Sequence, residues 1–183
     1  MIYRTLITIY ILLIPNVGNG QTYSTIVSDS IISSFMSDVL TSQQPYESAF
    51  NKLPKKVYYK PIHIGNANWD YRDLSDSVAF VDKFYELLKK VNLSNEDIDF
   101  LEKQYFGIKD TTWNLNINKV SFKKKYRKKR FKYSVPLFNK DYTLAVFWRY
   151  YYCGSLCAYS ELHTYRLVGN KWILDILITG WIS

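Results

Sequence analysis

The chain has 183 residues, with 24 Lys or Arg and 16 Asp or Glu, so its formal net charge at pH 7 is +8. This length suits one domain with a hydrophobic core, and a hydrophobic fraction of 48% with a charged fraction of 22% excludes a wholly disordered chain. Two cysteines are too few for a small disulfide-rich scaffold.

Residues 1–20 have the layout of a secretory signal peptide. Arg4 supplies a positive charge, Thr5 to Ile14 form an apolar run, and Gly18 and Gly20 are small residues before Gln21. Such a run rises only about 15 Å as a helix, so a membrane span is disfavoured and an uncleaved interfacial anchor is the alternative. We expect residues 21–183 to form one exported domain in the periplasm, on the cell surface or in the medium.

Three segments of the first half have helical periodicity. Apolar residues recur at helical spacing from Ser24 to Leu40 and again from Ser75 to Val91. A third, short helix begins after Ser94, because Asp97 follows at the spacing of a capping box, and it ends at Gly107.

The remaining segments predict β-strands. Pro61 places the earliest of them at a sheet edge, and residues 142–153 are apolar on both faces, as in a central strand. The last two strands are joined by a tight Gly169-Asn170 turn. The predicted class is therefore α+β, with N-terminal helices packed on a C-terminal antiparallel β-meander of NTF2-like or cystatin-like kind. The expected strands are Lys55–Ile64, Trp113–Asn118, Phe131–Leu137, Tyr142–Cys153, Glu161–Val168 and Lys171–Trp181.

Two cysteines flank a short loop between predicted strands. Cys153 and Cys157 could approach within bridging distance across the end of a hairpin, and an exported chain meets oxidising conditions. This pattern favours a structural disulfide. A redox-active pair is the alternative, although the usual spacing has two intervening residues and a βαβ context that this chain lacks.

Three polar residues share one face of a predicted strand, namely Glu161, His163 and Tyr165. They could form a general acid/base set, and with Cys153 or Cys157 they could form a nucleophile or a Cys₂His metal site. The more ordinary interpretation is the solvent face of an antiparallel sheet. The sequence therefore designates no catalytic residue, no metal ligand and no cofactor, and it does not favour an enzyme.

Nearly all of the excess positive charge lies in one short segment. Residues 21–183 carry 23 basic and 16 acidic residues, but outside this segment the balance is 15 to 16. A basic patch on an exported chain predicts an anionic glycan, lipopolysaccharide or membrane surface as partner rather than nucleic acid. A solvated charge run that protects a sheet edge is the alternative. The anion-binding candidates are Lys123, Lys124, Lys125, Arg127, Lys128, Lys129, Arg130 and Lys132.

Aromatic residues cluster beside the cysteine hairpin. Trp148, Tyr150 and Tyr152 alternate along one predicted strand, so they could form a stacking surface for sugars. Core and cross-strand packing is the alternative interpretation.

Several short motifs carry a family resemblance. These motifs are the helix at Leu93–Ile98 and the segments Ser134–Asp141, Tyr151–Cys157, Asn170–Trp172 and Trp181–Ser183. Together these motifs resemble a family of exported, functionally uncharacterised Bacteroidetes proteins that have a CGxLCGxG hairpin and a terminal Trp-Ile/Val-Ser. The chain departs from that pattern at Ala158 and Ser160, where the family has glycine. The resemblance implies an exported single domain and no particular activity.

Two functions are consistent with these patterns. The leading one is a non-enzymatic envelope or secreted domain that binds an anionic or carbohydrate partner. The alternative is a small extracytoplasmic hydrolase or redox protein that uses Cys153, Cys157, His163 and Glu161.

Overall fold

The computed structural model describes residues 22–42, 55–62, 88–124, 130–154 and 157–182. The signal peptide predicted at residues 1–20 lies outside these ranges, as does most of the helix predicted at residues 75–91, of which 88–90 are helical. Residues 125–129 of the basic segment also lie outside them.

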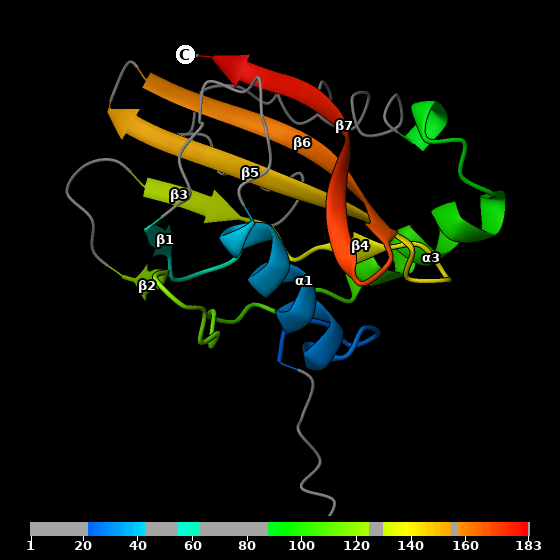
Figure 1. Cartoon of the computed structure of the whole chain (residues 1–183), viewed down its shortest axis with the longest axis horizontal. Coiled ribbons are helices and arrows are strands. Elements are labelled where there is room, and N and C mark those ends of the chain that lie inside the picture. The colour runs from blue at the N-terminus through cyan, green and yellow to red at the C-terminus, as the bar shows by residue number, and fades with distance from the viewer. Residues whose placement is uncertain (1–21, 43–54, 63–87, 125–129, 155–156, 183) are drawn as a thin grey trace, which may run out of the picture.

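A seven-stranded sheet organises the described chain (Figure 1), and its strand order is β2-β1-β3-β5-β6-β7, with β4 beside β5. Strands β3, β5, β6 and β7 are antiparallel neighbours, whereas β1 pairs in parallel with both β2 and β3. The α+β prediction is confirmed, but the sheet is mixed rather than wholly antiparallel. The strands are β1 Lys56–Tyr58, β2 Ser121–Lys123, β3 Arg130–Tyr133, β4 Leu137–Phe138, β5 Leu144–Gly154, β6 Cys157–Val168 and β7 Lys171–Ile182.

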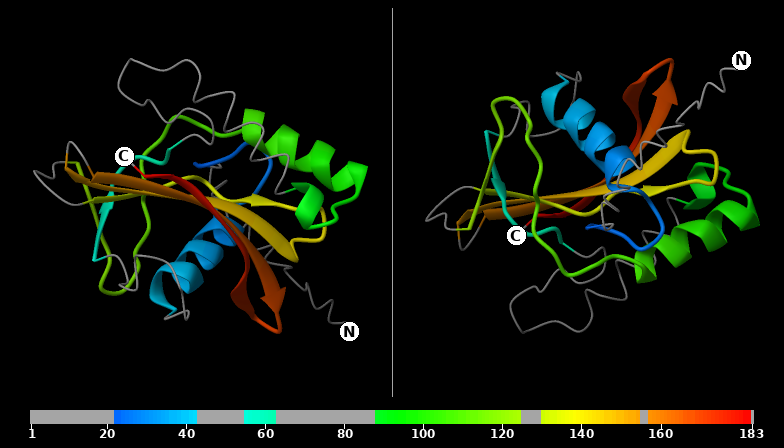
Figure 2. Two further views of the ribbon diagram at one scale, coloured as in Figure 1. Left: turned by 90° about the horizontal axis from the view of Figure 1, so that it is seen from above. Right: turned by 90° about the horizontal axis from the view of Figure 1, so that it is seen from below.

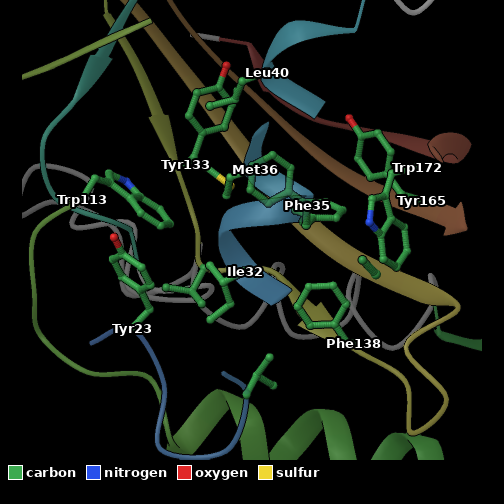
Figure 3. Close-up of a cluster of buried hydrophobic side chains, with 14 of the residues drawn as sticks. Tyr23, Ile32, Phe35, Met36, Leu40, Trp113, Tyr133, Phe138, Tyr165 and Trp172 are labelled. Atoms are coloured by element: carbon green, nitrogen blue, oxygen red, sulfur yellow. The ribbon is translucent and has the colours of Figure 1, made fainter. Parts of the chain in front are cut away.

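Two helices lie on opposite faces of this sheet (Figure 2): α1, Asp29–Thr41, and α3, Asn95–Phe106. On the α1 face, the ring of Phe35 packs edge-on against Phe138, Phe147, Tyr165 and Trp172, with ring centroids 5.2 to 5.6 Å apart. Figure 3 shows Phe35 beside Phe138, Tyr165 and Trp172. Such edge-to-face contacts add to the hydrophobic gain of burying the rings. The buried side chain of Phe35 therefore packs α1 against the four strands β4, β5, β6 and β7.

The predicted cap of α3 is present. The Ser94 hydroxyl accepts a hydrogen bond from the Asp97 backbone N–H at 3.1 Å, as a helix N-cap does. Gln104 then binds the helix to the sheet, because its amide both donates to and accepts from the backbone of Phe138 in β4. Gly107 ends the helix, and a Cβ there would lie 2.5 Å from the Thr25 side chain. This glycine thus permits the N-terminal segment to pass closely.

Three predicted strands differ from the structure. The segment predicted as a strand at Trp113–Asn118 forms none, although Trp113 and Ile117 are buried and the asparagines between them are exposed, as the alternation indicated. The strand predicted at residues 131–137 is divided into β3 and β4, because Pro136 has no backbone N–H to donate. The strand predicted at an edge, β1, instead lies between β2 and β3.

The C-terminal hairpin agrees with its prediction. Gly169 has φ of +62° between β6 and β7, a conformation that glycine adopts without steric cost. Strand β5, predicted to be central, pairs with β3 and β4 on one side and β6 on the other. No helix within the described ranges combines the length and apolarity that crossing a membrane requires.

Candidate functional site

Strand β5 directs successive polar residues to opposite faces of the sheet. Arg149 points to the face covered by α1, where Tyr133, Phe147 and Tyr165 belong to the core. Tyr150 points to the other face and packs with Trp148 beside the α3 core. These two residues belong to two polar groups, both within the described residues, that we consider as candidate sites.

The first group, which we call the buried charge cluster, consists of Arg149, Glu161, His163 and Tyr165. Arg149 lies directly opposite Glu161, and its guanidinium donates from both Nε, at 2.8 Å, and Nη2 to Glu161 Oε2. His163 Nε2 lies 2.9 Å from the same oxygen, and His163 Nδ1 lies 3.3 Å from the Tyr165 hydroxyl. One carboxylate oxygen therefore accepts three hydrogen bonds from two side chains.

The cluster corrects the interpretation of Glu161, His163 and Tyr165 as solvent-facing residues. Their exposed fractions are 0%, 1% and 2%, and that of Arg149 is 9%. The prediction that the three share a face was right, but the face is interior because α1 packs against it through Phe35. Strand alternation predicts which residues share a face, whereas packing decides which face is covered.

The protonation states of the cluster follow from its contacts. Burial raises the pKa of the Glu161 carboxyl, but the hydrogen bond from His163 and the charge of Arg149 outweigh it and lower that pKa to about 2. Burial lowers the pKa of His163, and its hydrogen bond to Glu161 does not offset this effect. At neutral pH the cluster therefore holds one anion, one cation and a neutral imidazole that donates from Nε2 and accepts from Tyr165 at Nδ1.

This arrangement is better suited to structure than to catalysis. A Tyr-His-Glu chain can relay a proton, but each member is at least 98% buried, and the Tyr165 ring lies against Phe35 and Phe147. A catalytic group must reach a substrate. Within the described ranges, Glu161 Oε1 has no hydrogen-bond partner. The cluster is thus a compensated buried ion pair that joins β5 to β6.

The backbone positions of the two cysteines lie at the end of the β5–β6 hairpin, several register pairs away from His163. The backbone places Gly154 opposite Cys157, and Cys153 lies in a register irregularity between Tyr152 and Gly154. The side chains of residues 152–159 are outside the described set, so the disulfide stays a prediction. No three His, Cys, Asp or Glu side chains in the described segments gather as metal ligands would.

The second group is a row of alternating lysine and tyrosine that crosses four strands, which we call the Lys–Tyr ladder. It consists of Lys123 in β2, Tyr58 in β1, Lys132 in β3 and Tyr150 in β5. Lys123 is the register partner of Tyr58, and Lys132 is the register partner of Tyr150. Because Val57 lies opposite Phe131 in the parallel pair, the residues that follow them, Tyr58 and Lys132, are neighbours on the opposite face.

Cation–π contacts join Lys132 to the two tyrosines of the ladder. The Lys132 ammonium lies 5.5 Å from the ring centroid of Tyr58 and 5.2 Å from that of Tyr150, so it is placed between two aromatic rings. Beside it, the Lys124 ammonium lies 6.0 Å from the Tyr59 ring, which in turn contacts Tyr58 edge-on at 5.0 Å. These distances are within the range at which a ring face attracts a cation. Unlike the cluster, the ladder is partly exposed, with Lys123 and Lys124 open to solvent.

The ladder includes some of the predicted site residues and excludes others. Lys123, Lys124 and Lys132 of the basic segment are in it or beside it, and Arg130 begins the same strand as Lys132. Lys125, Arg127, Lys128 and Lys129 lie outside the described residues. The sequence reasoning missed Tyr58 and Tyr59, for which the run of lysines and tyrosines at residues 55–60 was the available signal.

The predicted aromatic surface is not a single surface. Trp148 is 7% exposed and belongs to the core beneath α3, so it offers no stacking face. Tyr150 is half-buried and belongs to the ladder, while the side chain of Tyr152 lies outside the described set. The alternation of Trp148 with Tyr150 places both on one face, where Trp148 is buried in the core beneath α3 and Tyr150 packs partly buried against it.

Comparison of the chain with protein-family models, with curated proteins and with solved structures finds no significant match. The candidate sites therefore stand on their own geometry.

Proposed function

We propose that the protein is a non-enzymatic, exported binding domain whose partner is anionic. The observation that carries this proposal is the Lys–Tyr ladder, in which Lys132 is held between two tyrosine rings on a partly exposed face. A lysine restrained in this way has less side-chain freedom to lose when it contacts an anion, which favours binding.

Charge distribution supports the same partner class. The ladder lies at both ends of a segment in which eight of ten residues are basic, while the rest of residues 21–183 is close to neutral. A local excess of cations attracts anionic polymers and surfaces at a distance and releases their counterions on contact. Lys60, which follows Tyr59, is paired with Asp110 at 3.2 Å and is partly neutralised.

Export is part of the proposal and rests on sequence. The pattern of residues 1–20 and the resemblance of the C-terminal motifs to an exported Bacteroidetes family support it, and with it a periplasmic, surface or secreted location. The finer assignment of the fold as NTF2-like or cystatin-like also stays a prediction, and a fold of that kind by itself implies no function.

The test is retention on heparin and on immobilised lipopolysaccharide as a function of salt. A variant with Lys123, Lys124 and Lys132 replaced by Gln should elute at clearly lower salt than the parent. A control with Lys89, Lys90 and Lys171 replaced by Gln has the same net charge and alters only exposed lysines away from the ladder. Equal elution of the two variants would show that net charge, and not the ladder, governs binding, and the proposal would be wrong.

A further inference from the structure

Exposed apolar side chains gather at the turn end of the β6–β7 hairpin, residues 166–173, which we call the hairpin end. Leu167 is 36% exposed, Val168 57% and Ile173 44%. In the described ranges one other large apolar side chain is exposed, Phe106 of α3. Single exposed apolar residues are ordinary on a protein surface, whereas a contiguous group of them is a candidate contact site.

The hairpin end extends past the neighbouring strand. Strand β5 begins at Leu144, which pairs with Arg166, so the residues of β6 beyond Arg166 pair with β7 alone among the described strands. Figure 2 shows this two-stranded end turned away from the rest of the sheet. Because successive strand residues point to opposite faces, Leu167 shares the α1 face with its partner Trp172, and Val168 points to the other face. Exposed apolar side chains therefore lie on both faces of the hairpin end.

Two cations accompany these apolar residues. Lys171 is the register partner of Val168, and it is exposed. Arg166 is the register partner of Ile173, and Asp175 partly neutralises it at 2.8 Å. Two cations and one anion leave this region with a net charge of +1. Because Lys and Arg can bury their aliphatic stems while their charges stay in a polar layer, this surface suits a boundary between an apolar phase and anionic groups.

The addition of another strand to β7 is disfavoured at the hairpin end. The Leu167 N–H donates to Thr143 O at 2.8 Å, so it points towards β5 and away from β7. Opposite residues of an antiparallel pair either bond to each other or both point outward, so the Trp172 N–H points away from β6. There the Asp38 carboxylate of α1 accepts it at 2.6 Å. A second copy of the chain paired along β7 would have to displace Asp38.

A protein partner docked on one face of the hairpin end is also disfavoured. A stable protein–protein interface takes about 800 Å² and about 20–30 residues from each partner. The apolar group at the hairpin end has three side chains, and they are divided between two faces. A lipid bilayer contacts both faces of an inserted hairpin at once, and its boundary accepts a few apolar side chains with flanking cations.

We propose that the hairpin end inserts into the headgroup boundary of a lipid bilayer that contains anionic lipids. Leu167, Val168 and Ile173 enter the apolar side of this boundary, and Arg166 and Lys171 contact headgroup phosphates. The site is separate from the Lys–Tyr ladder, which lies on β1, β2, β3 and β5. The inference goes beyond the proposed function because burial of apolar side chains, and not charge, supplies most of the affinity.

Co-sedimentation of the purified protein with vesicles tests the proposal. We expect the parent to bind vesicles of phosphatidylcholine and phosphatidylglycerol, and the double variant Val168→Ser with Ile173→Ser to bind them about tenfold more weakly or worse. Phe106→Ser is the matched control, because it removes an exposed apolar side chain from α3, and it should bind as the parent does. Absence of binding by the parent, equal binding by the double variant, or an equal loss in Phe106→Ser would each overturn the proposal.

Salt and quenching separate insertion from attraction by the basic segment. In about 0.5 M NaCl the attraction between exposed charges is screened, but the difference between the parent and the double variant should remain. Brominated phosphatidylcholine should quench the added fluorescence of Val168→Trp and not that of Phe106→Trp. Loss of the difference at high salt, or no quenching of Val168→Trp, would show that the hairpin end stays outside the apolar region.

The competing occupant and the proposed function have outcomes of their own. If the parent self-associates in sedimentation velocity, the double variant does not and vesicles bind neither, the hairpin end is a protein interface and the bilayer assignment is wrong. Heparin retention of the double variant should equal that of the parent, and a lower retention would contradict a separate site. Failure of the proposed function is measured instead with the triple lysine variant, which keeps the hairpin end intact. Circular dichroism confirms that each variant is folded, as expected for exposed replacements.

Discussion

Two polar groups lie on opposite faces of the same sheet and show how burial changes the role of similar side chains. Arg149 and Tyr150 are consecutive in β5, yet Arg149 is 9% exposed and bound to Glu161, whereas Tyr150 flanks the partly exposed Lys132. In the buried charge cluster each charge needs a partner, because an unpaired buried ion is very costly. In the Lys–Tyr ladder Lys123 is exposed and Lys132 is partly exposed, so solvent contributes to stabilising their charges. The cluster therefore serves stability, and the ladder suits recognition.

The sharpest test of this comparison removes one cation from each face. Arg149→Met should lower the free energy of unfolding by about 3–5 kcal/mol, because it leaves the Glu161 carboxylate buried without a cation. Lys132→Met, on the other face, should cost less than about 1 kcal/mol. Urea denaturation measures both. Similar losses for the two variants would contradict the division of roles.

A double replacement tests whether the cluster acts as a pair. Arg149→Met combined with Glu161→Leu removes both charges, so it should be less destabilising than Arg149→Met alone. If the loss of unfolding free energy in the double variant equals the sum of the losses in the two single variants, the two residues do not interact.

Acid should destabilise the protein through the same cluster. The folded-state pKa of Glu161 is about 2, against 4.5 in a model peptide, so its contribution is present above pH 4.5 and is lost as pH falls towards 2. A difference of this size corresponds to about 3 kcal/mol. The pKa of His163 is also lowered, so below its ordinary value of 6.5 the unfolded state binds a proton that the folded state does not.

As pH falls, the titrations of Glu161 and of His163 both lower the stability of the folded state. Unfolding free energy should fall as pH decreases from about 6.5 to about 2, and urea denaturation at a series of pH values measures the slope. In Glu161→Gln the slope below pH 5 should be shallower, whereas in Lys132→Gln it should match that of the parent. A parent whose stability is constant over this interval would show that the cluster does not hold these protonation states.

Removal of one tyrosine hydroxyl from each face should give a smaller difference in stability than removal of one cation from each face. Tyr165→Phe removes the hydrogen bond to His163 Nδ1 and should cost about 1 kcal/mol, because a buried acceptor is left without its donor. Tyr150→Phe keeps the ring that flanks Lys132 and should change stability by less than about 0.5 kcal/mol. Thermal denaturation distinguishes the two, and a larger loss for Tyr150→Phe would reverse the assignment of the faces.

Much of the fold was predictable because it depends on local chemistry. The cap at Ser94, the end of α3 at Gly107, the turn at Gly169 and the central position of β5 each follow from a few neighbouring residues. The parallel pairs of β1 were not predictable, since they join residue 57 to residues 122 and 131, and nothing in the local pattern specifies such distant neighbours. The same reason explains why residues 111–117 alternate in burial without joining the sheet.

The candidate sites divide in the same way. The basic segment was visible in the sequence as a concentration of charge, and the shared face of Glu161, His163 and Tyr165 followed from strand alternation. Their burial was not visible, because it depends on α1, whose Phe35 comes from more than a hundred residues earlier in the chain. The partners of the basic residues, Tyr58 and Tyr59, were likewise separated from them in sequence.

The sequence by itself determined the α+β class, the capping and turn residues, and the location of nearly all excess positive charge in residues 123–132. Tertiary structure alone decided which face of the sheet is interior, and so which polar residues became an ion pair and which became a surface. The physical reason is that propensity and periodicity act over one helical turn or a few strand residues. Burial, register and charge pairing depend on contacts between segments that the chain brings together only when it folds.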